Sequence, residues 1–118
     1  MLEVIAKRGR RGIYSIAAQG HTGFADSGSD IVCAAVSTLM QALWTGLEDV
    51  LQLRSLQAVQ DPEVPYMARI WEESSREAQY IARTILLSLQ AIAESYPDYV
   101  LICELVEEEN GYDDEQKI

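Results

Sequence analysis

The sequence has very few residues of the kinds that bind metal ions or form disulfides. In 118 residues there is one histidine, His21, and there are two cysteines, Cys33 and Cys103. A zinc site built on His21 and Cys33 would need Asp26 and Asp30 as further ligands, and no recognised ligand spacing connects these four. So few cysteines are typical of the reducing cytoplasm, where a disulfide between Cys33 and Cys103 is disfavoured. The sequence therefore predicts a cytoplasmic protein with neither a metal site nor that disulfide.

The chain also lacks a secretory signal and an apolar stretch suited to crossing a membrane. In "MLEVIAKRGRRG" the apolar residues precede the basic ones, which is the reverse of their order in a signal peptide. The longest uncharged run of high apolar content, residues 31–47, is interrupted by Ser37, Thr38, Gln41 and Thr45. We therefore expect an amphipathic helix in this run, and no membrane partner.

Positive charge is scarce as well. Nine lysines and arginines stand against 19 acidic residues, and the formal net charge of −10 argues against direct binding of nucleic acid. Six of the acids and one lysine lie in residues 107–118, so this segment carries half of the net charge. The sequence predicts a single domain over residues 1–106, followed by a solvated, disordered tail. An acidic segment that attracts a basic partner is the alternative.

What is present is a regular alternation of short β-rich runs and two amphipathic runs. With 48% hydrophobic residues, the chain can bury a genuine core. The pattern predicts strands over residues 2–8, 13–19, 55–60, 66–71 and 99–107, with "GRRG" as the turn of the first hairpin. It predicts helices from an Asp30 cap to about Leu51 and from a Ser74 cap to about Ser95.

The order ββαββαβ predicts an α+β domain around one mixed, mostly antiparallel five-stranded sheet with two main helices. The last strand begins with the continuously apolar run "YVLIC". Such a strand is typical of a central position that is covered on both faces. We therefore expect one helix on each face of the sheet, with both helices on one face as the alternative.

Cys33 and His21 form the most reactive pair that the sequence offers. Cys33 is the third residue of the first predicted helix, where unpaired N–H groups and the helix dipole favour a thiolate. His21 precedes it on a glycine-rich segment and is suited to moving a proton, and the same N–H groups are suited to hold an oxyanion. From the residues alone, two other interpretations remain open: Cys33 as a small buried hydrophobe and His21 as an exposed loop residue.

Two neighbours bear on this chemistry. Ser37 lies four residues after Cys33 on the same helix face, where it can bond a site group or can simply be a tolerated polar residue. As the N-cap, Asp30 brings a negative charge close to Cys33, which by itself raises the thiol pKa. This effect shrinks if the carboxylate is engaged in capping the helix or in holding His21.

The segment "GHTGFADSGSDIVCAAVS", residues 20–37, resembles the signature of a bacterial family of ribosomal-processing cysteine proteases called Prp. That signature has a Gly-His-Ala-Gly-type start, a short glycine-containing loop, and then Asp-Ile-Val-Cys-Ala-Ala-Val-Ser. Thr22 stands where the family has alanine, and "ADSGSD" is small and polar where other members place an aromatic or charged residue. These departures leave the details of substrate choice open. Length and element order agree over the whole chain.

The resemblance implies that Cys33 is the nucleophile and His21 its general base and acid, with Asp30 and Ser37 as further active-site positions. It implies a glycine-rich loop that is mobile until substrate orders it, and the loop's glycines are Gly20, Gly23 and Gly28. It also implies that the protein removes a short N-terminal extension from ribosomal large-subunit protein 27, that it acts as a homodimer, and that it uses no metal or organic cofactor.

Family members cut after bulky aromatic residues, which implies an apolar pocket near the catalytic pair. Phe24, Met40 and Trp44 are candidates to line it, although the core is the commoner place for residues such as Met40 and Trp44. A basic ribosomal protein is a suitable substrate for a chain of net charge −10. The alternative function is a non-catalytic, acidic ribosome-assembly or binding module.

Overall fold

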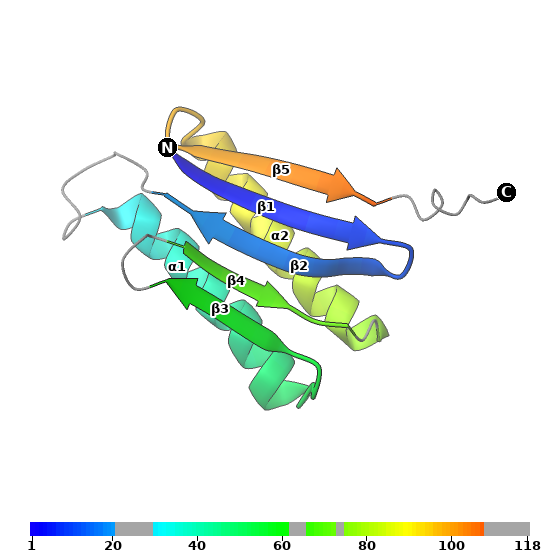
Figure 1. Ribbon diagram of the computed structural model, residues 1–118. Helices are drawn as coiled ribbons and strands as arrows, with labels where there is room; N and C mark the ends of the chain where they lie inside the picture. The colour runs from blue at the N-terminus through cyan, green and yellow to red at the C-terminus, as the bar shows by residue number, and fades with distance from the viewer. Residues whose placement is uncertain (21–29, 62–65, 73–74, 108–118) are drawn as a thin grey trace, which may run out of the picture.

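Figure 1 shows the computed structural model of the chain, which describes residues 1–20, 30–61, 66–72 and 75–107. In these residues the elements follow the predicted ββαββαβ order. The strands are β1 (Leu2–Gly9), β2 (Gly12–Gln19), β3 (Gln57–Asp61), β4 (Tyr66–Ile70) and β5 (Val100–Val106). The helices are α1 (Ile31–Trp44), which continues as the π-helical segment η2 (Thr45–Val50), and α2 (Arg76–Ser95).

The strands form one sheet in the order β3-β4-β2-β1-β5. Strand β5 runs parallel to β1, and the other neighbours are antiparallel, so the predicted mixed, mostly antiparallel sheet is confirmed. The prediction of a central last strand is wrong, because β5 is an edge strand whose one partner in the sheet is β1. Its Val100 faces the core, whereas Leu101 and Leu105 are 45% and 51% exposed. The helices therefore bury only one side of this apolar run, to which Val100 and Ile102 belong.

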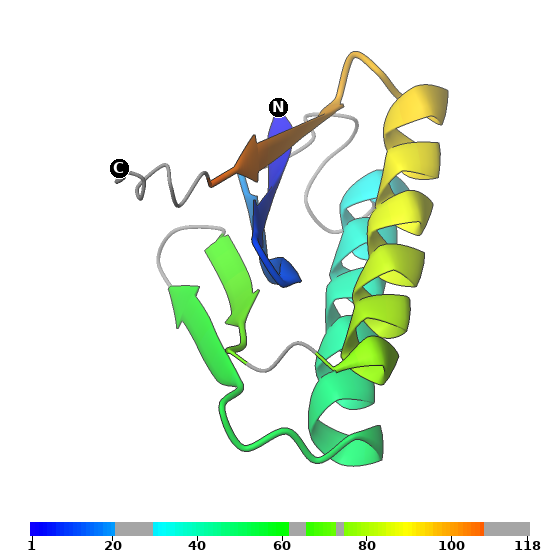
Figure 2. The same ribbon diagram turned by 90° about the vertical axis from the view of Figure 1, so that its right-hand side faces the viewer.

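Both helices lie on the same face of the sheet, as Figure 2 shows, and they pack against each other. The expectation of one helix on each face is wrong, and the alternative of both on one face is correct. The physical reason is that the inward sides of α1, α2 and the sheet close a single core rather than two. Its members include Val36, Met40 and Leu43 of α1, Ala82, Leu86 and Leu89 of α2, and Val4, Ile16 and Ala18 of the sheet.

The first helix is rich in apolar residues because one of its sides is buried in the core. By length and composition alone, the described helix over Ile31–Val50 would suffice to cross a membrane. Its Val32, Val36, Met40 and Leu47 are instead buried in the core. The apolar run that the sequence shows here is thus used in packing α1 and η2 against the sheet and α2.

The ends of the helices are set by caps close to the predicted positions. The predicted N-cap Asp30 is confirmed, since its side chain accepts a hydrogen bond from the N–H of Cys33. Helix α2 begins one residue later than expected, because Ser75 is the cap and accepts from the N–H of Ala78 at 3.1 Å. Ser74 lies outside the described residues.

The last described residue, Glu107, is attached to the sheet. Its N–H donates to the carbonyl of Arg8 at 2.8 Å, and its carboxylate accepts a hydrogen bond from the Tyr14 hydroxyl. Burial raises the pKa of Tyr14 to about 12, together with the hydrogen bond to Glu107 and the charge of that residue. The rest of the predicted tail, residues 108–118, lies outside the described residues.

Candidate active site

Cys33 lies in the first turn of α1, directly inside the cap formed by Asp30. The N–H of Cys33 donates to Oδ1 of Asp30 at 2.9 Å. The N–H of Ala34 donates to the main-chain carbonyl oxygen of Asp30 at 3.1 Å. Asp30 itself is buried, at 7% exposure. These two amides are therefore committed to the helix start, and an oxyanion next to Cys33 would need another donor.

The surroundings of Cys33 do not favour the thiolate as the sequence had suggested. The pKa of the Cys33 thiol is raised above its ordinary value, first by burial and then by the negative charge of Asp30, while a side-chain hydrogen bond with Ser37 acts in the opposite direction. The helix start thus carries a capping carboxylate that offsets its positive end. Burial and the charge of Asp30 therefore favour the neutral thiol of Cys33 over its thiolate.

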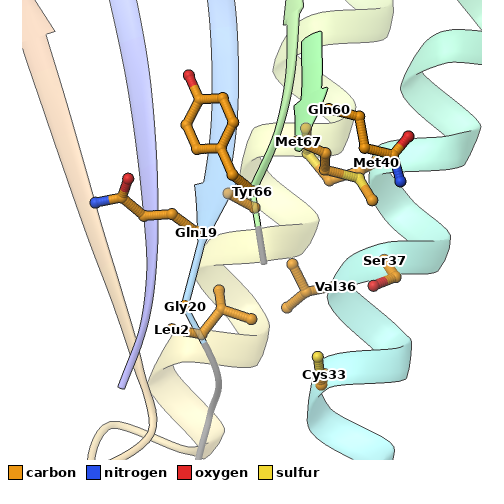
Figure 3. A pocket seen from close by; sticks show the side chains of 11 residues that line it. Leu2, Gln19, Gly20, Cys33, Val36, Ser37, Met40, Gln60, Tyr66 and Met67 are labelled. Atoms are coloured by element: carbon orange, nitrogen blue, oxygen red, sulfur yellow. The ribbon is translucent and has the colours of Figure 1, made fainter. Parts of the chain in front are cut away.

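Cys33 opens onto a cavity of about 190 Å³ between α1 and the sheet. In Figure 3, Cys33 stands at one end of this cavity, and Met40, Met67 and Gln60 gather at the other. Ser37 lies between them, one helical turn from Cys33. The walls are mainly apolar, and they are formed by Leu2, Ala18, Val36, Met40 and Met67.

A glycine shapes the end of β2 beside this cavity. Gly20 adopts a φ of +91°, and a Cβ at this position would lie 2.6 Å from the main-chain oxygen of Met1. Only glycine accepts both the left-handed backbone and this close approach. The chain therefore passes directly beside the cavity as it enters the segment that carries His21.

Four of the predicted site residues come together around the cavity: Gly20, Cys33, Ser37 and Met40. Trp44 is not among the lining residues, because its ring lies over the guanidinium of Arg69, 4.7 Å from ring centroid to Cζ. Asp30 caps α1 beside Cys33 and is not a lining residue. The other predicted members lie outside the described residues: His21, Gly23, Phe24 and Gly28.

The sequence did not point to the lining residues contributed by the sheet. Leu2, Gln60 and Met67 come from β1, β3 and β4, and no motif links them to Cys33. Only the strand order brings them opposite α1. Within residues 1–20, 30–61, 66–72 and 75–107, no three His, Cys, Asp or Glu side chains lie close enough together to hold a metal ion.

The chain is similar to known proteases over most of its length. The sequence model of a family described as "Cysteine protease Prp" matches residues 1–101. The ribosomal processing cysteine protease Prp of Mycoplasma genitalium is 30% identical over 89 residues, which are 75% of this chain and 86% of that protein.

Solved structures agree with the fold. SMU.848 from Streptococcus mutans superposes with a TM-score of 0.74 at 28% identity, covering 91% of this chain and 96% of the other. An essential ribosomal processing protease Prp from Staphylococcus aureus, in complex with a covalently linked product peptide, superposes with a TM-score of 0.73 at 25% identity, covering 88% and 99%. With a family match over most of the chain and the cavity beside Cys33, the protein belongs to the Prp family of ribosomal-processing cysteine proteases.

Proposed function

We propose that this protease removes an N-terminal extension from ribosomal large-subunit protein 27, with Cys33 as the nucleophile and His21 as the general base and acid. The observation that carries the proposal is the position of Cys33, whose side chain opens onto an apolar cavity beside Ser37. The substrate and the roles of both residues rest on the motif "GHTGFADSGSDIVCAAVS" and on the family. As a member of a protease family, the chain is better explained by catalysis than by a non-catalytic binding module.

The cavity supports a substrate with an aromatic residue at the cleavage site. An apolar cavity of about 150 Å³ is known to hold a benzene molecule, and the cavity here measures about 190 Å³. Met40 and Met67 line it, and methionine sulfur makes favourable contacts with aromatic rings. One aromatic side chain of the extension therefore fits, with its scissile carbonyl near Cys33.

The raised pKa of the Cys33 thiol favours a mechanism in which a base takes the thiol proton during the attack. His21 takes the thiol proton as the sulfur attacks the carbonyl carbon, and an oxyanion forms. His21 then gives that proton to the leaving amine, the C–N bond breaks, and a thioester joins Cys33 to the extension. Water, deprotonated by His21, hydrolyses the thioester and restores the thiol. A covalent species of this kind is consistent with the product peptide that is covalently linked to the Staphylococcus aureus relative.

Ser37 is the described side chain best situated to assist these steps. It bonds the Cys33 thiol and lines the cavity, whereas the N–H groups of Cys33 and Ala34 are engaged with Asp30. Its hydroxyl is a donor that can turn to the sulfur or to the developing oxyanion. In this role the hydroxyl takes the place of the N–H groups of Cys33 and Ala34, and the prediction of helix-start amides as oxyanion donors stays a prediction.

We further propose that the protein acts in the cytoplasm as a homodimer, without a metal, an organic cofactor, a membrane or a direct nucleic-acid contact. The net charge of −10 supports attraction of a basic ribosomal protein and opposes contact with phosphates. The two cysteines are free thiols, which is consistent with a reducing compartment.

The test is cleavage of a peptide that spans the extension junction and carries an aromatic residue before the scissile bond. Cys33→Ala should lower kcat by a factor of about 10³ or more, while the matched Cys103→Ala variant should cleave normally. Replacing the aromatic residue of the peptide by alanine should lower kcat/KM about 30-fold or more, because its burial is lost. Undiminished cleavage by Cys33→Ala would falsify the nucleophile assignment, and indifference to the aromatic residue would exclude the cavity as its binding site.

A further inference from the structure

The turn between β1 and β2 holds a large share of the positive charge of this acidic chain. Four of the nine lysines and arginines fall in residues 7–11, in the run "KRGRR". In Figure 1 this turn lies at the end of the sheet away from the N-terminus. The cavity beside Cys33 lies at the other end of β1 and β2, where Leu2 and Gly20 line it. The net charge of −10 therefore does not describe the turn, and the cleavage site does not use it.

Helix α2 is fixed to this turn through Gln79. The N–H of Ile13 donates to Oε1 of Gln79 at 2.9 Å, and Nε2 of Gln79 donates to the carbonyl oxygen of Ile13 at 2.8 Å. Gly12 adopts a φ of +112°, and a Cβ at this position would collide with Oε1 of Gln79. The close approach of helix and turn thus requires the glycine.

This attachment brings two arginines from distant parts of the chain to one small cavity. Arg8 pairs in register with Ile13 across the first hairpin, and Arg83 lies one helical turn after Gln79 on the same side of α2. Both arginines line a cavity of about 110 Å³, together with Gly12, Ile13 and Gln79. No acidic residue is among the described residues that line it.

Both guanidinium groups have donors to spare. Nη2 of Arg8 donates to Oε1 of Glu104 at 2.9 Å, in an ion pair whose side chains are 45% and 33% exposed. A guanidinium carries five N–H donors, so most of those of Arg8 are not used in this pair. Arg83 has neither an ion pair nor a hydrogen bond to its side chain within the part of the chain that the structure describes.

We propose that the Arg8–Arg83 cavity binds a phosphate group, with the two guanidinium groups as its charged ligands. An apolar cavity of about 150 Å³ holds a benzene ring, so the 110 Å³ here suits a group of similar or smaller size. A tetrahedral phosphate offers oxygens to guanidinium groups that approach from two directions, whereas a planar carboxylate matches one guanidinium fork. The inference goes beyond the proposed cleavage and does not depend on it.

A larger neighbouring cavity bears on the source of the phosphate. It measures about 550 Å³, shares Gly12 and Ile13 with the Arg8–Arg83 cavity, and is also lined by Arg10, Arg11, Glu72 and Glu107. Cavities of about 300–1,000 Å³ are typical of small-molecule sites. The phosphate is therefore inorganic phosphate or the phosphate of a small monoester. The two glutamates would repel the further phosphates of a nucleic acid.

The first test is titration of the full chain with inorganic phosphate at an ionic strength held constant with sodium chloride. The NMR signals of the Gly12 N–H and the Gln79 side-chain amide should shift and saturate. At ten times the dissociation constant, Tm should rise by about 6 °C. Arg83→Gln should bind about 10-fold or more weakly, because a charge-assisted hydrogen bond is lost. The matched control is Arg54→Gln, at an exposed arginine that lines neither cavity, and it should bind as wild type does.

Phosphate also stabilises proteins without a specific site, so the comparison between variants decides. A response that never saturates, or equal affinity in Arg83→Gln and wild type, would overturn the proposal. Arg8 is tested in a Glu104→Gln background, so that its ion pair is absent from both proteins that are compared. In that background Arg8→Gln should again weaken binding about 10-fold or more, and equal affinity would remove Arg8 from the site and refute the two-arginine arrangement.

A second titration distinguishes the sources of the phosphate. Tighter binding of ribose 5-phosphate than of inorganic phosphate would assign the site to a monoester whose organic part occupies the larger cavity. Tighter binding of inorganic phosphate would assign it to the free ion. Binding of an RNA oligonucleotide without binding of either small phosphate would overturn the proposal.

Discussion

Replacement of Asp30 separates two effects of its carboxylate, which caps α1 and also opposes ionisation of Cys33. The cap is the hydrogen bond from the N–H of Cys33 to Oδ1 of Asp30, at 2.9 Å. The charge of the same group contributes to the raised pKa of Cys33. Asp30→Asn retains an oxygen that can cap the helix and removes the charge, whereas Asp30→Ala removes both.

Loss of an N-cap costs about 1 kcal/mol, within a range of about 0.5–2 kcal/mol. For 118 residues, the unfolding entropy near the midpoint is about 0.25 kcal/mol per degree, so 1 kcal/mol lowers Tm by about 4 °C. Asp30→Ala should therefore lose about 4 °C, and Asp30→Asn, with a comparably good cap, should stay within about 2 °C of wild type. In both variants the pKa of Cys33 should fall, because removal of a negative charge favours the thiolate.

The assays are thermal unfolding and the pH dependence of alkylation by iodoacetamide, both in a Cys103→Ser background so that only Cys33 is labelled. Alkylation should begin at a lower pH in both Asp30 variants, while Tm should fall only in Asp30→Ala. The reasoning is refuted if Asp30→Asn loses as much stability as Asp30→Ala. It is also refuted if neither variant shifts the alkylation profile.

Three further predictions concern the walls of the site and the end of the sheet. Met40→Ala should destabilise the fold by about 2–5 kcal/mol in denaturant titrations, because Met40 is fully buried and supports the cavity; a loss below about 1 kcal/mol would contradict this. Gly20→Ala should lower Tm and slow cleavage, because alanine meets both a φ of +91° and a main-chain oxygen; unchanged Tm and rate would argue against that strain. Absorbance of tyrosinate should show one group that ionises near pH 12 and is absent in Tyr14→Phe. Since the folded pKa of Tyr14 is raised, its contribution to stability is complete below about pH 10 and is lost as the pH rises through about 12; an identical titration in Tyr14→Phe would contradict this assignment.

The strands and helices were largely predictable, because each carries its own local signal. Hydrophobic periodicity located all seven elements, and the strand over residues 2–8 differs from β1 by a single residue. The Asp30 cap followed from residue type and position alone. The π-helical end of the first helix had no such signal, since a six-residue segment with i→i+5 bonding is too short to show a repeat of its own.

The placement of the last strand was not predictable in the same way. The run "YVLIC" is typical of a strand that is covered on both faces, and the sequence does not say where in the sheet that strand lies. In the structure the helices cover one face and β5 is at the edge. The rule for continuously apolar strands thus failed for β5, which is an edge strand with Leu101 45% exposed.

By itself, the sequence determined the order of the elements, the cap on the first helix and the cysteine protease motif, because these depend on residues that are close together in the chain. Only the tertiary structure decided that both helices share one face, that Leu2 and Met67 join Cys33 around one cavity, and that burial and Asp30 raise the pKa of the thiol. These properties arise from contacts between distant segments. The strand order fixes those contacts, and local patterns do not encode it.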